Sequence, residues 1–172
     1  WHDLFDTRLV APRLLQAAPN ADFDIRAKFQ GTYSGTFTMQ GLIAQQTFKD
    51  FVRVDVYRSG STRRVYAATF VNGTATTRLD APVTIGTSTS PDVFLRLKRV
   101  GDQFTVYWSA DGTTWTSAGS FNHPTVISAV GTWTGSHSGN GTTSQPMTGI
   151  VDYFETSTAP LVASAVRTTV SS

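Results

Sequence analysis

Carboxylate pairs are the first chemistry to look for in this sequence, because glycosidic-bond hydrolysis uses one carboxyl group as acid and another as nucleophile or base. The chain has a single glutamate, Glu155, and its nearest acidic neighbour is Asp152. A spacing of three puts two side chains on opposite faces of a regular strand, since strand side chains alternate. Asp22 and Asp24 are better explained as solvent-facing charges at a strand edge. We therefore predict no enzyme, and a polysaccharide hydrolase is the less favoured alternative.

Metal and nucleophile chemistry finds little support in the residue types present. The chain has no cysteine, so a disulfide, a thiolate nucleophile and a cysteine metal site are excluded. His2, His123 and His137 are far apart and lack the spacing of zinc ligands. No Gly-x-Ser-x-Gly elbow precedes a helix. We expect no cofactor, except that loop aspartates and backbone carbonyls would suffice for a structural Ca²⁺, by analogy alone.

A row of polar side chains marks one face of a predicted strand. Arg53, Asp55 and Tyr57 alternate with three valines, so the valine face must be core. The polar face is then either an open concave sheet or plain solvent surface. On an open sheet it would bind sugar, with Arg53 and Asp55 bonding to hydroxyls while Tyr57 stacks. Otherwise the charges form a cross-strand ion pair worth well under ~1 kcal/mol. Gln45, on another predicted strand, joins the sugar-binding candidates.

The tryptophans divide between core and candidate stacking positions. Trp108 alternates with apolar residues, so we expect it in the core, and Trp115 should pack on the hairpin after an Asp-Gly turn. The run from Ser109 to Trp115 resembles the Asp-box of sialidases, a structural turn without a catalytic role. Trp133 precedes the polar, Gly-rich segment Gly135–Gln145, where it could stack on a sugar at the mouth of a loop. Core packing is the alternative for Trp133.

Apolar residues alternate with a period of two along the chain, and no segment has a helical period over ten or more positions. The predicted strands outside the hairpin described next are Asp22–Phe29, Gln40–Gln46, Phe51–Arg58, Val65–Val71, Pro82–Ile85, Thr114–Phe121, Val126–Thr134, Met147–Glu155 and Leu161–Ser172. Gly, Asn, Asp and Ser separate them. This pattern predicts an all-β fold, an antiparallel two-sheet β-sandwich of jelly-roll type.

The stretch from Val93 to Trp115 is the clearest indicator of the fold. It predicts two strands around a tight Gly101-Asp102 turn, then a second turn at Ala110-Asp111-Gly112 into a third strand. Gly-Asp and Asp-Gly supply the positive φ angles that short hairpins need.

Composition limits the class of protein. A chain of 172 residues with 40% hydrophobic and 15% charged residues suits one globular domain. Its net charge of +2 comes with dispersed arginines, so no basic face for nucleic acid is expected. No apolar run approaches the ~20 residues that a membrane span requires. The abundance of Ser, Thr and Gly is typical of secreted β-proteins.

Several motifs, in this order along the chain, resemble a bacterial extracellular domain family of unknown function in the concanavalin A-like lectin/glucanase superfamily. They are His2-Asp-Leu-Phe, Ala11-Pro-Arg-Leu-Leu-Gln16, Gln40-Gly-Leu-Ile-Ala-Gln-Gln46, Phe51-Val-Arg-Val-Asp-Val-Tyr57, Tyr66-Ala-Ala-Thr-Phe-Val-Asn-Gly73, Tyr107-Trp-Ser-Ala-Asp-Gly-Thr-Thr-Trp115 and Val151-Asp-Tyr-Phe-Glu155. The resemblance spans residues 2–155. It implies a concanavalin A-like jelly roll that accompanies carbohydrate-active catalytic domains and binds sugar.

The chain departs from this family at both ends. Members usually begin with a further strand before the His-Asp-Leu element, whereas here a strand-like tail, Leu161–Ser172, follows the usual end. A sandwich that lacks a strand exposes an unpaired edge. The tail could fill that edge in its own chain or in a neighbour, by donor-strand exchange that would build a polymer. The third alternative is that the tail is a linker.

We therefore predict a β-sandwich domain over residues 1–158, secreted or at the cell surface, followed by an extra strand or linker over residues 159–172. Its predicted function is non-catalytic, lectin-like binding of a polysaccharide or glycan. The residues predicted to bind it are Gln45, Arg53, Asp55, Tyr57 and Trp133. The alternative from another class is a self-assembling surface-filament subunit, a homo-oligomer or polymer joined through residues 161–172.

Overall fold

All regular secondary structure in the described part of this chain is β-strand. The computed structural model describes residues 4, 9–31, 33, 35–85, 92–137 and 147–156, together with the backbone of 167–169. The strands are β1 (Arg13–Ala17), β2 (Phe23–Phe29), β3 (Thr38–Gln45), β4 (Phe51–Ser59), β5 (Thr62–Val71), β6 (Thr74–Val83), β7 (Val93–Val100), β8 (Gln103–Ser109), β9 (Thr116–Asn122), β10 (Ala129–Ser136), β11 (Val151–Thr156) and β12 (Arg167–Thr169). Within these residues, no helix could cross a membrane.

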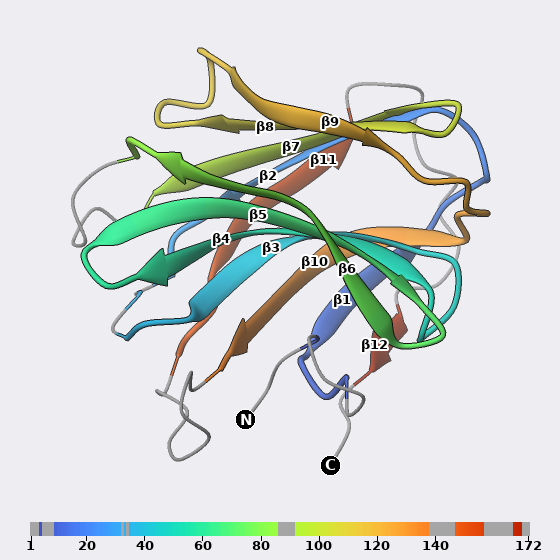
Figure 1. The fold of residues 1–172 in the computed structure, drawn as a ribbon, viewed down its shortest axis with the longest axis horizontal. Coiled ribbons are helices and arrows are strands. Elements are labelled where there is room, and N and C mark those ends of the chain that lie inside the picture. Colours follow the sequence, from blue (N-terminus) through green and yellow to red (C-terminus); the bar gives the residue numbers. More distant parts are fainter. Residues whose placement is uncertain are drawn as a thin grey trace.

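Two antiparallel sheets lie face to face (Figure 1). The larger sheet has seven strands in the order β12-β1-β10-β3-β4-β5-β6, and the smaller has five in the order β11-β2-β7-β8-β9. In Figure 1 the five-stranded sheet lies above the strongly curved seven-stranded sheet. The predicted all-β, two-sheet sandwich is confirmed.

The space between the sheets holds the main hydrophobic core. Val52, Val54 and Val56 of β4 are fully buried there, as their alternation predicted. From the other sheet, the ring of Phe104 packs edge-on against Phe23, with ring centroids 6.2 Å apart. Fully burying a side chain of this size contributes about 1.5–3 kcal/mol, so this layer holds the two sheets together.

The predicted meander from β7 to β9 is present with both of its turns. Gly101, in the turn between β7 and β8, has a φ of 57°, and Gly112, between β8 and β9, has a φ of 77°. Residues with a Cβ rarely adopt such angles, which explains glycine at both positions. Trp108 of β8 is partly buried and packs against the main core, as predicted.

Some strand boundaries differ from those predicted. The segment predicted as Pro82–Ile85 belongs mostly to β6, which begins eight residues earlier, at Thr74. Because β6 is the edge strand and polar along much of its length, its sequence lacks a period of two. Strand β10 runs to Ser136 and so includes the start of the predicted Gly135–Gln145 loop. Residues 138–145 of that loop lie outside the described residues.

A second apolar cluster lies on the side of the seven-stranded sheet that points away from the five-stranded sheet, here named the outer face. It consists of Leu4, Leu9, Ala11, Leu15, Met39, Ile43, Phe51, Tyr66, Ala68, Phe70 and Trp133. Leu4 and Leu9, which precede β1, are 0% and 1% exposed. Leu4 and Leu9 therefore help to cover a face that we predicted to be either an open concave sheet or plain solvent surface.

The C-terminal tail contributes a short strand to the same sheet. Strand β12 pairs antiparallel with β1, with Thr169 opposite Arg13 and Arg167 opposite Leu15. It extends the edge of the seven-stranded sheet within its own chain. Residues 161–166 and 170–172 of the predicted tail strand lie outside the described residues.

Candidate functional site

The strand register arranges the outer face in rows that cross the sheet. One row places Trp133, Gly41 and Asp55 on neighbouring strands, and the same row continues to Tyr66 and Asp80. The row beside it contains Met39, Tyr57 and Arg64. Together the two rows hold three of the five predicted sugar-binding residues, Asp55, Tyr57 and Trp133. Arg53 lies in the next row, opposite Ile43 and Ala68, and Gln45 lies farther along β3.

Arg53 and Asp55 form an ion pair inside the protein. The Nε of Arg53 donates to Oδ1 of Asp55 at 3.0 Å, and the two residues are 4% and 0% exposed. The guanidinium also lies 4.5 Å from the Trp133 ring and 5.2 Å from the Tyr66 ring. The structure corrects the predicted exposure of this pair, because side chains of the second apolar cluster surround it. As arranged here, neither charge can reach a ligand.

Trp133 lies opposite a glycine on the neighbouring strand. Its neighbour across the β3–β10 pair is Gly41, and a Cβ at Gly41 would lie 1.8 Å from the backbone oxygen of Val54. Glycine is therefore required there, and the indole ring packs beside it over Arg53. Trp133 is 3% exposed. This corrects the placement of Trp133 at an open loop mouth, in favour of the core alternative.

Gln45 is hydrogen-bonded to a second buried cation, Arg13. Its Oε1 accepts a hydrogen bond of 2.7 Å from Nη1 of Arg13, which also donates to the backbone oxygen of Phe48 at 3.1 Å. The guanidinium lies between the Phe48 and Phe51 rings, 4.5 and 4.4 Å from their centroids. Burial lowers the pKa of Arg13 to about 10. The Gln45 amide thus helps to solvate Arg13.

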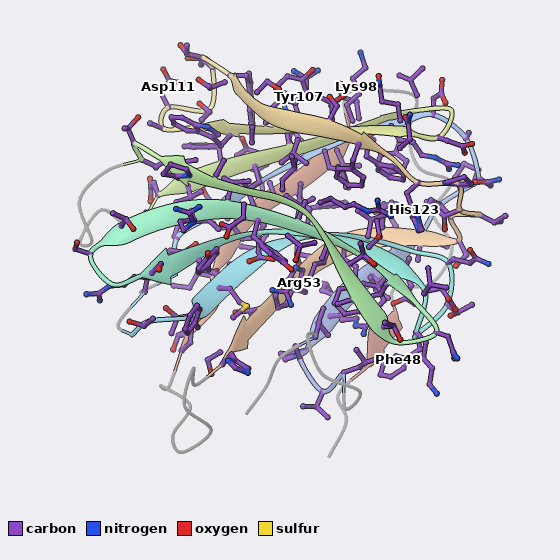
Figure 2. All side chains as sticks on the ribbon, viewed as in Figure 1. Phe48, Arg53, Lys98, Tyr107, Asp111 and His123 are labelled. Carbon is purple, nitrogen blue, oxygen red and sulfur yellow. The ribbon has the colours of Figure 1, made fainter. Side chains whose placement is uncertain are left out.

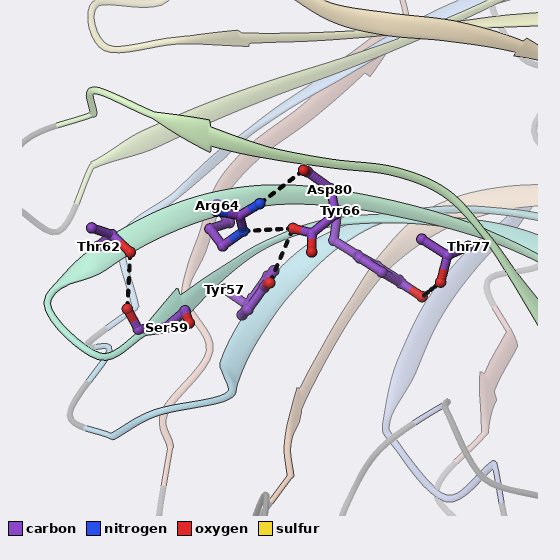
Figure 3. A network of polar contacts seen from close by, with 7 residues as sticks. All are labelled: Tyr57, Ser59, Thr62, Arg64, Tyr66, Thr77 and Asp80. Atoms are coloured by element: carbon purple, nitrogen blue, oxygen red, sulfur yellow. Dashed lines mark hydrogen bonds and ion pairs between the residues drawn. The ribbon is translucent and has the colours of Figure 1, made fainter.

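Tyr57 belongs to a polar cluster that remains partly open to solvent. Its hydroxyl donates to Oδ1 of Asp80 at 3.0 Å, and the same oxygen accepts from Nε of Arg64 at 2.7 Å (Figure 3). Arg64 also donates through Nη2 to the Asp80 backbone oxygen at 2.9 Å. The Asp80 and Arg64 side chains are 40% and 27% exposed. Burial, followed by the Asp80 hydrogen bond, raises the pKa of Tyr57 to about 12, so its hydroxyl stays a donor at neutral pH.

Aromatic rings flank this open cluster. The Phe37 ring stacks on Tyr57 with centroids 5.9 Å apart and planes 16° from parallel, and His137 meets the edge of Phe37 at 6.1 Å. Phe37 has a φ of 59°, a conformation that costs a residue with a side chain about 1–2 kcal/mol. No local pattern in the sequence points to Phe37 or Asp80, which lie far from Tyr57 along the chain. Tyr57, Arg64, Asp80 and Phe37 are named here the Asp80 cluster.

The sequence of residues 5–156 matches the family described as the beta xylosidase C-terminal concanavalin A-like domain. The chain belongs to this family. The matched region runs from the N-terminal segment to the end of β11, which includes both sheets apart from β12. Membership of the concanavalin A-like superfamily, which the sequence motifs implied, is thereby confirmed.

Solved structures share the fold of this concanavalin A-like domain at low sequence identity. A functionally unknown protein from Saccharomyces cerevisiae is 17% identical with a TM-score of 0.62, covering 87% of this chain and 74% of its own. A xylan beta-1,4-xylosidase from Bacillus halodurans C-125 is 15% identical with a TM-score of 0.59, covering 78% of this chain. This chain spans only 27% of that enzyme.

Chicken galectin 2 has the same fold at 9% identity and a TM-score of 0.55, covering 84% of this chain and 98% of its own. Identities this low show the fold alone. None of the curated proteins matches the sequence.

The carboxylates of β11 in this concanavalin A-like domain are held in ion pairs on the five-stranded sheet. Asp152 pairs with Lys28 at 3.0 Å, and Glu155 pairs with Arg26 at 2.5 Å. Lys28 and Arg26 are two apart on β2, so both acids reach the same face. This corrects the prediction of opposite faces, because a register shift between Val151 and Tyr153 interrupts the alternation of β11.

Metal ligands do not gather among the described residues of the domain. In that part of the chain, no three His, Asp or Glu side chains are close enough to hold an ion. His2 lies outside the described residues, and the structural Ca²⁺ stays an untested expectation.

Proposed function

We propose that this domain is a non-catalytic carbohydrate-binding module that acts outside the cell and binds its glycan at the Asp80 cluster. The observation that carries this proposal is the partly exposed Asp80 carboxylate, which fixes the Tyr57 hydroxyl and the Arg64 guanidinium beside a stacked aromatic pair. Groups fixed before binding lose little conformational entropy when a ligand arrives. The concanavalin A-like fold supports a module of carbohydrate-binding type.

The cluster offers the two kinds of contact that sugars use. The Tyr57 and Phe37 rings supply apolar surface, and Asp80 and Arg64 supply an acceptor and donors of fixed direction. The Tyr66 and Thr77 hydroxyls, 2.8 Å apart, continue the polar surface beside them (Figure 3). Because the Arg64–Asp80 charges cancel, the cluster suits a neutral sugar.

The ligand we propose is a neutral, β-linked plant polysaccharide of the xylan class. Support comes from the family description and from the solved xylan β-xylosidase of the same fold. A binding module needs no catalytic carboxylates, and the ion pairs of Glu155 and Asp152 favour a structural role for both acids. A glycoside hydrolase is therefore the less favoured reading of the same fold.

Calorimetric titration of the chain with xylohexaose tests this function. Wild type should bind, and Tyr57→Ala and Asp80→Ala should each weaken binding by at least about tenfold, the usual loss for an interface anchor. Thr62→Ala is the matched control, because it removes a hydroxyl that bonds to the Ser59 oxygen outside the cluster. Unchanged affinity in both cluster variants, or release of xylose by the wild type, would refute the proposal.

A further inference from the structure

A second surface lies on the opposite side of the sandwich. The back face is the side of the five-stranded sheet that points away from the core, with Asp24, Arg26 and Lys28 of β2, Phe94, Arg96 and Lys98 of β7, and Tyr107 of β8. Figure 2 shows Lys98, Tyr107 and Asp111 at the top of the molecule, across the sandwich from Arg53. This face is separate from the Asp80 cluster.

Hydrogen bonds within the β8–β9 loop fix its shape, and the loop lies against the back face at Phe94. Oδ1 of Asp111 accepts from the backbone N–H groups of Thr113 and Thr114, both at 2.7 Å. Oγ of Ser109 accepts from the N–H of Gly112 at 2.9 Å. Gly112 lies against Phe94, since a Cβ there would be 2.7 Å from Cε1 of that ring. A loop whose backbone donors are satisfied internally holds the residue that follows it, Trp115, in one place.

Trp115 and Tyr107 both lie close to an immobilised guanidinium. The Cζ of Arg96 is 5.1 Å from the Tyr107 ring and 5.9 Å from the Trp115 ring. Arg96 donates from Nε to Oδ1 of Asp24 at 2.7 Å, and from Nη2 to Oδ2. Both rings are half-buried, so each keeps exposed aromatic surface. Two partly exposed rings beside a fixed donor offer a surface on which a sugar chain can stack.

The charges of this face cancel almost completely. The basic residues are Arg26, Lys28, Arg96 and Lys98, and the acidic residues beside them are Asp24, Asp92, Asp152 and Glu155. A polyanion would require an excess of positive charge, which this face lacks. An uncharged chain with many hydroxyls fits the donors and acceptors of the ion pairs Arg26–Glu155, Lys28–Asp152 and Arg96–Asp24.

We propose that the back face is a second carbohydrate-binding surface, which takes a neutral polysaccharide chain that stacks on Trp115 and Tyr107 and hydrogen-bonds to the ion pairs beside them. This goes beyond the function proposed above, whose ligand lies on the opposite side of the sandwich, and either surface can fail without the other. A domain with both surfaces would link two glycan chains, or bind one polymer with the avidity of two contacts.

Titration of the ¹⁵N-labelled full chain, followed by NMR, can separate the two surfaces. The probes are xylohexaose, cellohexaose and laminarihexaose, with oligogalacturonate as the acidic comparison. At least one neutral probe should shift the Trp115 indole and Tyr107 amide signals, and oligogalacturonate should not. Trp115→Ala should weaken this response by at least about tenfold and leave any response of Tyr57 and Asp80 unchanged. Tyr107→Ala repeats the test if the first variant does not fold.

Lys98→Gln is the matched control, because it removes a charge from the same face and keeps both rings. Its affinity for the neutral probe should equal that of wild type at low and high salt. The proposal is overturned if oligogalacturonate binds at least as well and salt abolishes its binding, since recognition would then follow charge. It is also overturned if the Trp115 signal shifts with protein concentration alone, which would identify a surface between two copies, or if no neutral probe shifts it.

Discussion

Removal of the Asp55 carboxylate should destabilise the fold strongly, although the sequence favours a surface role for this residue. In Asp55→Ala the Arg53 guanidinium would keep its charge at 4% exposure and lose the carboxylate 3.0 Å away. Removing one partner of a buried ion pair lowers the free energy of unfolding by about 3–5 kcal/mol, because the other charge stays buried without compensation. The Trp133 and Tyr66 rings retain cation–π contacts with Arg53, each worth about 0.5–2 kcal/mol, so the lower end of that range is expected.

Urea denaturation at neutral pH measures this loss, and an exposed pair supplies the comparison. Asp80→Ala removes the partner of Arg64 at the surface, where a salt bridge contributes about 0–1 kcal/mol. The double variant Arg53→Met/Asp55→Leu should recover much of the lost stability, because it leaves no uncompensated charge at this position. The reasoning fails if Asp55→Ala is as stable as wild type yet loses glycan binding, since Asp55 would then lie in an open sugar-binding row.

Three further changes test other parts of the structure. Gly41→Ala should cost more than about 2 kcal/mol in urea denaturation, because the new Cβ would collide with the Val54 backbone oxygen 1.8 Å away; a neutral substitution would contradict the packing of Trp133. Hydrogen bonds from the Thr114 and Thr113 backbone, then from Ser109, hold the pKa of Asp111 well below its usual range. The charged carboxylate therefore stabilises the fold above about pH 4, and the difference in melting temperature between wild type and Asp111→Asn should shrink as the pH falls further; a difference that grows would have the wrong sign. Deletion of residues 161–172 should leave a folded monomer by size-exclusion chromatography; polymers that form only with the tail would favour the donor-strand alternative.

The sequence was sufficient to predict structure wherever the signal is a pattern among neighbouring residues. The valines of β4 alternate, and burial of one strand face follows directly from that period. Gly101 and Gly112 mark turns that need a positive φ, and the structure has both. Strand β6 was mostly missed because an edge strand with polar residues on both faces has no period of two to detect.

The site was less predictable because it depends on contacts between distant segments. Arg53 and Asp55 look like surface residues from β4 alone, and their burial comes from a cluster to which Leu4 and Leu9 contribute. Asp80 lies 23 residues from its partner Tyr57, and nothing local in the sequence connects the two. A regular strand would put Glu155 and Asp152 on opposite faces. The register shift in β11 places both on the same face instead.

A crystal structure of the domain with xylohexaose tests the central claim most directly. The account predicts a xylose ring over Tyr57 or Phe37, with sugar hydroxyls within about 3.2 Å of Asp80 or Arg64, the range of ordinary hydrogen bonds. Xylohexaose bound away from both the Asp80 cluster and the back face, or an unoccupied Asp80 cluster at saturating ligand, would contradict it.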